Sequence, residues 1–189
     1  MPTHSGFSKS VLFTPAGTRQ MNAHIKLVTW NCRALLHANR RLRERKLAIT
    51  RKLANDADII FLQEVHGELT LFEVTLRDVC RNFWVSHFFS DDPGTGSVVT
   101  LVSKTLVPDG SIVVSIEVAK SRVIRTVVTG VNGSMHLWNI HNFGINAAAL
   151  ADVATSLRAD GGATHLHPNR LVTFVGGDFN FLPADEQYV

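Results

Sequence analysis

The sequence predicts a mixed α/β domain. Apolar runs rich in Val, Ile and Thr alternate along the chain with segments whose apolar residues recur at helical spacing. The length of 189 residues suits one domain, and the 45% hydrophobic and 19% charged contents are close to the averages of soluble domains, which excludes disordered and collagen-like classes. No apolar run reaches about 18 residues, and no signal peptide is recognisable. We therefore expect an intracellular protein, nuclear or cytoplasmic, that is neither secreted nor bound to a membrane.

The first half of the chain carries a βαβ pattern after an irregular start. Residues 1–24 mix Ser, Thr, Pro and Gly without periodicity, so we expect a flexible leader, followed by a domain over residues 25–189. Buried strands then alternate with amphipathic helices. The expected elements are a strand at 25–31, a helix at 39–56, a strand at 58–64, a helix at 69–80 and a strand at 83–90.

The second half is richer in strands. Four β-rich runs are separated by turn residues, and a helix and a last strand follow them. We expect Gly161 to end that helix, because glycine is common just beyond helix C-termini. The expected strands are 97–104, 111–119, 123–130, 135–143 and 170–180, with the helix at 147–160. The helices must then cover the outer faces of more than one sheet.

Positive charge is concentrated in the expected helix at 39–56. Residues 1–56 contain eleven Lys and Arg and two acidic residues, a net charge of +9, whereas the rest has eight basic and fourteen acidic residues, a net charge of −6. In the helix the basic residues surround an apolar stripe of Leu42, Ile49 and Leu53. The basic face is either an ordinary solvated helix surface or an electrostatic guide for a polyanion.

Polar residues end four of the expected strands. They are Asn31, Gln63 with Glu64, His141 with Asn142, and Asp178 with Asn180. Ligands and catalytic groups collect at such ends because the sheet fixes the backbone while the loop frees the side chain. Singly, each has an ordinary explanation as a turn-capping amide, an edge carboxylate or a core histidine. Their coincidence in one chain indicates a shared site.

Together with their neighbours, these residues resemble the motifs of the endonuclease/exonuclease/phosphatase family, the DNase I-like group. The matching segments follow the family's order over residues 25–181: "TWNCRAL", "FLQEVHG", the strand led by Gly96, "WNIHNFG" and "VGGDFN". The resemblance implies a four-layer α/β sandwich, in which two packed mixed β-sheets are flanked by helices. It also implies hydrolysis of a phosphate ester with Mg²⁺ or Mn²⁺, hard cations that suit carboxylate and amide oxygens.

The resemblance also implies a role for each polar strand-end residue. Glu64 is expected to be the principal metal ligand, with Asn31 beside it. Asp178 is expected to orient or deprotonate the attacking water, and Asn180 to hydrogen-bond the phosphate. His141 lies where relatives place a phosphate-contacting Tyr or His. These five residues form the expected catalytic set.

Two further expectations concern substrate contacts and the end of the chain. His66 and Asn142 are expected to bind the substrate, and a plain loop histidine is the alternative for His66. Family members end with a further strand and a Ser-Asp-His-like motif, and nothing after Asn180 supplies it. We therefore expect a domain that lacks its last strand or strands and is inactive by itself, either as part of a longer polypeptide with fused domains or as a truncated copy of a mobile-element gene.

The favoured interpretation is metal-dependent phosphodiester hydrolysis on nucleic acid, with DNA favoured over RNA. Among family branches the chain is most similar to retroelement or apurinic-type endonucleases, because its first half is basic and contains "LQEVHG". Two alternatives stay open. One is a phosphatase or sphingomyelinase-type phosphoesterase of the same family, because the core motifs do not encode the leaving group. The other is a degenerate, non-catalytic fragment that binds phosphate or nucleic acid.

Overall fold

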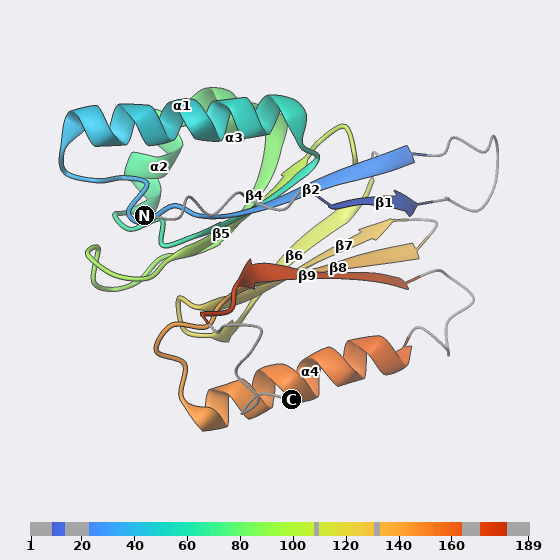
Figure 1. Ribbon diagram of the computed structural model, residues 1–189. Coiled ribbons are helices and arrows are strands. Elements are labelled where there is room, and N and C mark those ends of the chain that lie inside the picture. Colours follow the sequence, from blue (N-terminus) through green and yellow to red (C-terminus); the bar gives the residue numbers. More distant parts are fainter. Residues whose placement is uncertain (1–8, 14–22, 108–109, 131–132, 164–170, 181–189) are drawn as a thin grey trace.

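The computed structural model describes residues 9–13, 23–107, 110–130, 133–163 and 171–180 (Figure 1). Within these ranges the strands form two sheets, which we call sheet A and sheet B. Sheet A has the strand order β1-β2-β3-β5-β4. Its strands are β1 (Lys9–Phe13), β2 (Ala23–Asn31), β3 (Ile59–Gln63), β4 (Phe83–Phe88) and β5 (Val98–Ser103).

Sheet B has the strand order β6-β7-β8-β9. Its first three strands form an antiparallel meander, and β9 pairs with β8 in parallel. The strands are β6 (Ile112–Ala119), β7 (Val123–Gly130), β8 (Gly133–His141) and β9 (Leu171–Asp178). Both sheets are therefore mixed, as the resemblance implied.

Each sheet contains one parallel pair of strands joined through a long helix. The helix α1 (Arg40–Asp56) connects β2 to β3, and α4 (Ala147–Ala163) lies between β8 and β9. A parallel connection must carry the chain back along the sheet, and a helix does this while covering the sheet face. The two strands of each pair consequently end at the same edge of their sheet.

The helices cover the outer faces of the two sheets, so the domain has four layers (Figure 1). The helices α1, α2 (Leu69–Thr75) and α3 (Arg77–Asn82) lie over sheet A, and α4 lies over sheet B. The side chain of Asn39 caps α1 by accepting a hydrogen bond from the backbone of Leu42. The four-layer α/β sandwich is thus confirmed.

Three apolar clusters hold the four layers together. One lies between sheet A and its helices and includes Leu47, Phe72 and Leu76. A second joins the two sheets, with Phe61 from β3 and Phe174 from β9 among its members. A third, around Trp138 and Val153, fastens α4 to sheet B. This stacking follows from strands that are apolar on both faces.

The structure differs from the sequence-based expectation near the start of the chain. A strand, β1, lies inside the expected flexible leader and pairs antiparallel with β2, which itself begins at Ala23. Pairing with β2 satisfies the backbone hydrogen-bonding groups of β1. The irregular composition of this segment had not predicted an ordered strand. The rest of the expected leader, residues 1–8 and 14–22, lies outside the described residues.

The expected apolar stripe of α1 was wrong at two of its three residues. Leu42 and Ile49 are 41% and 47% exposed, whereas Leu47 and Thr50 are buried against sheet A and Leu53 packs beside them. Residues 47, 50 and 54 share one helix face at the i, i+3, i+7 spacing. Tertiary contacts bury this face instead of the one that carries Leu42 and Ile49.

Two helix boundaries also differ from the prediction. The expected helix at 69–80 is interrupted at Leu76, whose φ of −116° and ψ of 31° separate α2 from α3. The interruption allows the buried Leu76 and Val79 to reach the same cluster as Phe72. The helix α4 continues through Gly161 to Ala163 instead of ending at the glycine. Asp160, hydrogen-bonded to Arg125 and Trp138, holds its last turn against sheet B.

Among the described residues, none of the helices combines the length and apolar character that a membrane crossing requires.

Candidate functional site

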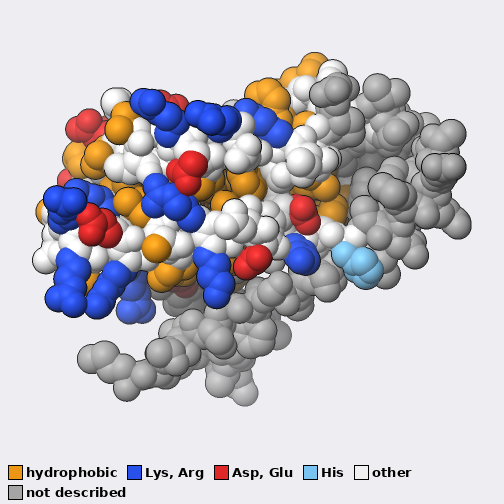
Figure 2. Space-filling model, turned by 90° about the horizontal axis from the view of Figure 1, so that it is seen from above, with side chains coloured by type: hydrophobic (Ala, Val, Ile, Leu, Met, Phe, Trp, Pro, Cys, Tyr) orange, Lys and Arg blue, Asp and Glu red, His pale blue; other side chains and the backbone are white. Residues whose placement is uncertain are grey.

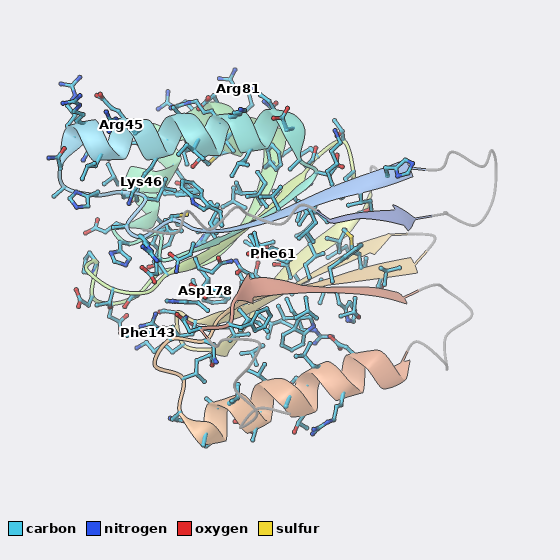
Figure 3. The ribbon with its side chains drawn as sticks, viewed as in Figure 1. Arg45, Lys46, Phe61, Arg81, Phe143 and Asp178 are labelled. Carbon is cyan, nitrogen blue, oxygen red and sulfur yellow. The ribbon has the colours of Figure 1, made fainter. Side chains whose placement is uncertain are left out.

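The polar strand-end residues meet at one edge of the sandwich. Asn31 ends β2 and is in register with Gln63, the last residue of the parallel strand β3. His141 ends β8 and is in register with Asp178, the last residue of β9. Figure 3 shows Asp178 at the same end of the molecule as the loop that follows β2 (Figure 1). Each sheet therefore contributes one parallel pair to the site.

Asn31 connects the two carboxylates of the site. Its Nδ2 donates a hydrogen bond of 2.9 Å to Glu64 Oε1 and one of 2.7 Å to Asp178 Oδ2. Its Oδ1 accepts a bond of 3.0 Å from the backbone of Arg33. The amide group thus faces the carboxylates with its donor side and holds an acid from each sheet. Direct ligation of a cation by Asn31, as the resemblance implied, stays a prediction and requires the amide oxygen to turn.

Glu64 is held in a backbone conformation that few residues adopt. Its φ is 51°, and the φ of His66 is 55°. The chain between β3 and α2 is fixed in this form by backbone hydrogen bonds, in which Ala34 donates to Glu64 and Val65 donates to Ser97. Strained backbone of this kind persists where surrounding contacts over-determine it, and it concentrates at functional sites. Here it directs the Glu64 carboxylate toward Asp178 and His141.

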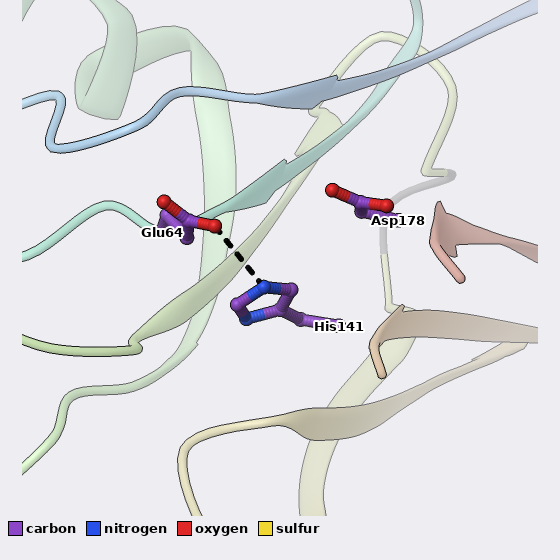
Figure 4. A group of neighbouring side chains, drawn as sticks. All are labelled: Glu64, His141 and Asp178. Atoms are coloured by element: carbon purple, nitrogen blue, oxygen red, sulfur yellow. Dashed lines mark ion pairs between the residues drawn. The ribbon is translucent and has the colours of Figure 1, made fainter. Parts of the chain in front are cut away.

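His141 is buried and faces the Glu64 carboxylate (Figure 4), with Arg122 on the other side of its ring. Its Nδ1 is 2.8 Å from Nη1 of Arg122, and its Nε2 is 3.2 Å from Glu64 Oε1. The second distance suits an ion pair, but the direction of the contact does not meet hydrogen-bond geometry, so Nε2 is buried without a hydrogen-bond partner among the described residues. Burial, and next the positive charge of Arg122, lower the pKa of His141, which favours the neutral ring.

Two glycines allow β9 to bring Asp178 to this position. A Cβ on Gly177, whose φ is 153°, would lie 1.8 Å from the carbonyl oxygen of Ile140 on β8. A Cβ on Gly176 would lie 2.9 Å from the ring of Phe61 between the sheets. The Gly-Gly pair before Asp178 is therefore required by close approach of backbone and ring.

A buried polar link beneath the site was not predicted. Gln63 donates a hydrogen bond of 2.7 Å from Nε2 to Oδ1 of Asn139, and so joins β3 in sheet A to β8 in sheet B. Asn139 in turn donates to the backbone carbonyls of Leu62 and Val99. The sequence signal was available, since both are amides within apolar strands. Only the packing of the sheets shows that they face each other.

The remaining expected residues lie around this cluster with different contacts. Asn142 donates from Nδ2 to the carbonyl of Phe179, so its amide supports the loop that carries Asp178. Asn180 is exposed at the site, and its backbone N–H donates to Asp178 Oδ1. His66 is half-buried beside Glu64, and burial is the main cause that lowers its pKa. Substrate contacts of these three residues stay predictions.

The cluster suits a hard divalent cation. One ligand atom each from Glu64, His141 and Asp178 lies within 4.8 Å of the others. Two carboxylates from different sheets offer the oxygen ligands that Mg²⁺ and Mn²⁺ prefer. The donor set therefore fits the cation that the resemblance implied.

Positive charge lies beside the acidic cluster and on the outer helices. Lys46 of α1 donates hydrogen bonds to the backbone carbonyls of Arg33 and Ala34, in the loop after β2. The pKa of Lys46 is lowered by burial, and the negative charge of the nearby Glu64 opposes this shift only in part. Farther out, Lys and Arg side chains gather over α1 and α3 (Figure 2). The exposed ones are Arg40, Arg41, Arg45, Lys52, Arg77 and Arg81.

Residues 28–189 match the Endonuclease/Exonuclease/phosphatase family. The chain belongs to this family. Of the curated protein sequences, none matches the chain. Membership agrees with the four-layer architecture and with the strand-end cluster described above.

Several solved structures share the fold of this family member. AP endonuclease LMAP from Leishmania major has a TM-score of 0.63 at 17% identity, covering 93% of this chain and 62% of that one. TDP2 from C. elegans has a TM-score of 0.56 at 19% identity, covering 84% of this chain and 48% of that one. D. rerio TDP2 complexed with single strand DNA product has a TM-score of 0.55 at 18% identity, covering 85% and 62%. The chain thus spans about half the length of the C. elegans protein, and the likeness shows a common fold.

Proposed function

We propose that the cluster of Asn31, Glu64, His141 and Asp178 hydrolyses phosphodiesters in nucleic acid, with DNA as the favoured substrate. The observation that carries the proposal is the convergence of two carboxylates and a buried imidazole from two different sheets within 4.8 Å. Two carboxylates placed close together repel each other and so destabilise the fold unless a positive charge lies between them. Structure alone gives no reason for such an arrangement, whereas a bound cation does. Membership of the Endonuclease/Exonuclease/phosphatase family supports phosphoester chemistry.

The residues divide the work of hydrolysis by their geometry. Glu64 and Asp178, with Asn31 between them, would hold a divalent cation, which neutralises phosphate charge and stabilises the leaving oxygen. The Asp178 carboxylate, oriented by Asn31 and by the backbone of Asn180, is placed to accept a proton from an attacking water. His141 and the exposed Asn180 side chain supply hydrogen-bond donors for phosphate oxygens.

Nucleic acid is the proposed substrate because of the positive charge on the helices that cover sheet A. The exposed Lys and Arg of α1 and α3 form a basic surface that would attract a polyanion (Figure 2). An AP endonuclease and a TDP2 complexed with single strand DNA product share the fold, which favours DNA. The narrower assignment to apurinic-type or retroelement endonucleases rests on this likeness and on the sequence around Glu64.

Nicking of supercoiled plasmid DNA in Mg²⁺ tests the proposal, on the 189-residue chain and on a longer polypeptide that contains it. We expect Asp178→Asn or Glu64→Gln to reduce turnover by about 10²–10⁴-fold. Arg41→Ala, on the exposed face of α1, should instead weaken DNA binding and reduce its salt dependence.

Two outcomes contradict the proposal. Release of phosphate from small phosphomonoesters without nicking would assign the site to the phosphatase branch. The other outcome is that both polypeptides bind DNA but neither nicks it, and that Glu64→Gln leaves the binding unchanged. That result would indicate a non-catalytic binding domain.

A further inference from the structure

Arg122 contacts His141 through both its backbone and its side chain. Arg122 lies immediately before β7, and its carbonyl oxygen accepts a hydrogen bond of 2.8 Å from the backbone N–H of His141. Its Nη1 lies 2.8 Å from Nδ1 of the imidazole. Two contacts between the same residues fix the position of the ring relative to the end of β8. The other ring nitrogen, Nε2, lies 3.2 Å from Glu64 Oε1.

The chemistry of the two groups determines which ring nitrogen carries the proton. A guanidinium has five N–H donors and no acceptor, so Nδ1 of His141 must accept. The neutral imidazole has one donor and one acceptor, and its proton therefore lies on Nε2. A doubly protonated ring would set two donors against each other at 2.8 Å. The contact is compatible only with the neutral Nε2–H form.

The Nε2–H group faces the acidic cluster, and its contact with Glu64 is not a well-directed hydrogen bond. It lies 3.2 Å from Glu64 Oε1, outside hydrogen-bond geometry, and is buried. A buried donor whose nearest acceptor is poorly aligned is destabilising. A phosphate oxygen entering the cluster would supply a well-placed acceptor. A metal ion would not, because ligation requires a free lone pair on Nε2.

Phe143 covers the pair from the solvent side. Its ring is stacked on that of His141, with centroids 6.1 Å apart and planes inclined by 17°, and the Arg122 guanidinium carbon lies 5.8 Å from its centroid. The Phe143 side chain is itself exposed, at 62%. The Phe143 ring therefore lies beside both partners of the contact and favours the guanidinium through its π face.

We propose that Arg122 is a positioning residue that holds His141 in the Nε2–H tautomer, so that His141 donates to a phosphate oxygen and leaves the cation to Glu64 and Asp178. The hydrogen bond from His141 Nε2–H to a substrate phosphate rests on the proposed function. The tautomer and the division of ligands are properties of the resting protein, and they can be measured whether or not the protein turns over DNA.

The tautomer is tested by long-range ¹H–¹⁵N correlation spectra of metal-free protein labelled on histidine, with His141→Gln to assign the signals. We expect the wild-type ring to show a protonated Nε2 and an unprotonated Nδ1. Arg122→Met should move the ring to a mixture of tautomers, and Arg122→Lys, which keeps a cationic donor, should preserve the wild-type pattern. A wild-type ring with the proton on Nδ1, or a pattern unchanged in Arg122→Met, would overturn the proposal.

A second measurement separates donation from metal ligation and needs no Arg122 variant to fold. Mn²⁺ is titrated into wild-type protein and into His141→Gln, and binding is followed by electron paramagnetic resonance. We expect the dissociation constants to agree within about twofold, whereas loss of a ligand, or of a group that orients a ligand, would weaken binding by about tenfold or more. Weakening of that size overturns the proposal. Absent nicking together with the expected tautomer and Mn²⁺ results would contradict the proposed function while leaving the role of Arg122 supported.

Discussion

Asn31 Nδ2 donates a 2.7 Å hydrogen bond to Asp178 Oδ2, although 147 residues separate the two in the chain. The bond crosses from β2 in sheet A to β9 in sheet B and therefore closes the functional edge of the sandwich. Because the same amide also donates to Glu64, both acids share one neutral partner. A divalent cation would interact with both carboxylates more strongly than the neutral Asn31 amide does. Charge neutralisation therefore favours metal binding at the cluster.

The first prediction concerns metal binding. Glu64→Gln removes a carboxylate from the cluster, and Asn31→Ala removes the group that orients both carboxylates, so both changes should weaken Mn²⁺ binding. For Asn31→Ala we expect about a tenfold effect, the size typical for partners of metal ligands. Titration calorimetry measures it, with Glu44→Gln as a control, because Glu44 lies on the exposed face of α1. Equal affinities in Glu64→Gln and wild type would exclude a cation at this site.

The second prediction concerns Gly177. In Gly177→Ala the new Cβ would lie 1.8 Å from the Ile140 carbonyl oxygen, so β9 must move away from β8. We expect the free energy of unfolding to fall by about 3 kcal/mol or more, the upper range for overpacking. The matched control is Gly144→Ala, where φ is also positive at 73° but nothing lies within 4 Å. That change should cost only the conformational strain, about 1–2 kcal/mol. Urea unfolding distinguishes the two, and similar losses would mean that the close approach is not limiting.

The third prediction concerns the link between Gln63 and Asn139. Either change alone, Gln63→Leu or Asn139→Leu, leaves a buried amide without its partner and should cost about 1–3 kcal/mol beyond any packing change. The double variant should be more stable than the sum of the two losses predicts, because neither unpaired amide then remains. A double-mutant cycle by chemical denaturation measures the coupling. Strict additivity would show that the two amides do not stabilise the contact between the sheets.

The fourth prediction concerns stability against pH. His66, His87 and His141 each have a pKa lowered from 6.5, with burial as the largest cause. The unfolded chain therefore takes up protons near pH 6.5 before the folded protein does. Since stability rises with pH wherever the unfolded state binds more protons, the free energy of unfolding should be highest above pH 6.5 and decrease as the pH falls below it.

Urea unfolding between pH 5.5 and 8 measures this slope. His87→Gln should flatten the slope, because the half-buried His87 lies on β4, away from the acidic cluster. A stability that is constant over this range, or that rises toward pH 5.5, would contradict the prediction.

The sequence by itself determined the order of the elements and the identity of the polar strand ends. Periodicity is a local property, so the strands ending at Asn31 and Asp178 could be placed from the order of the residues alone. The motif around Glu64 added the family, and the family implied two packed sheets. Local patterns also failed in specific places. Leu42 and Ile49 looked like the buried stripe of α1, and Gly161 looked like the end of α4.

The tertiary structure alone decided which of these residues face each other. Sheet packing selected Leu47 and Thr50 as the buried face of α1, because burial depends on where a helix rests and not only on its own spacing. It brought Asn31 to Asp178 and placed Arg122 against His141, a contact without any sequence signal. Such contacts join residues far apart in the chain, and their geometry follows from strand register and sheet stacking. For that reason the sequence could name the acids of the site, but only the fold showed which groups orient them.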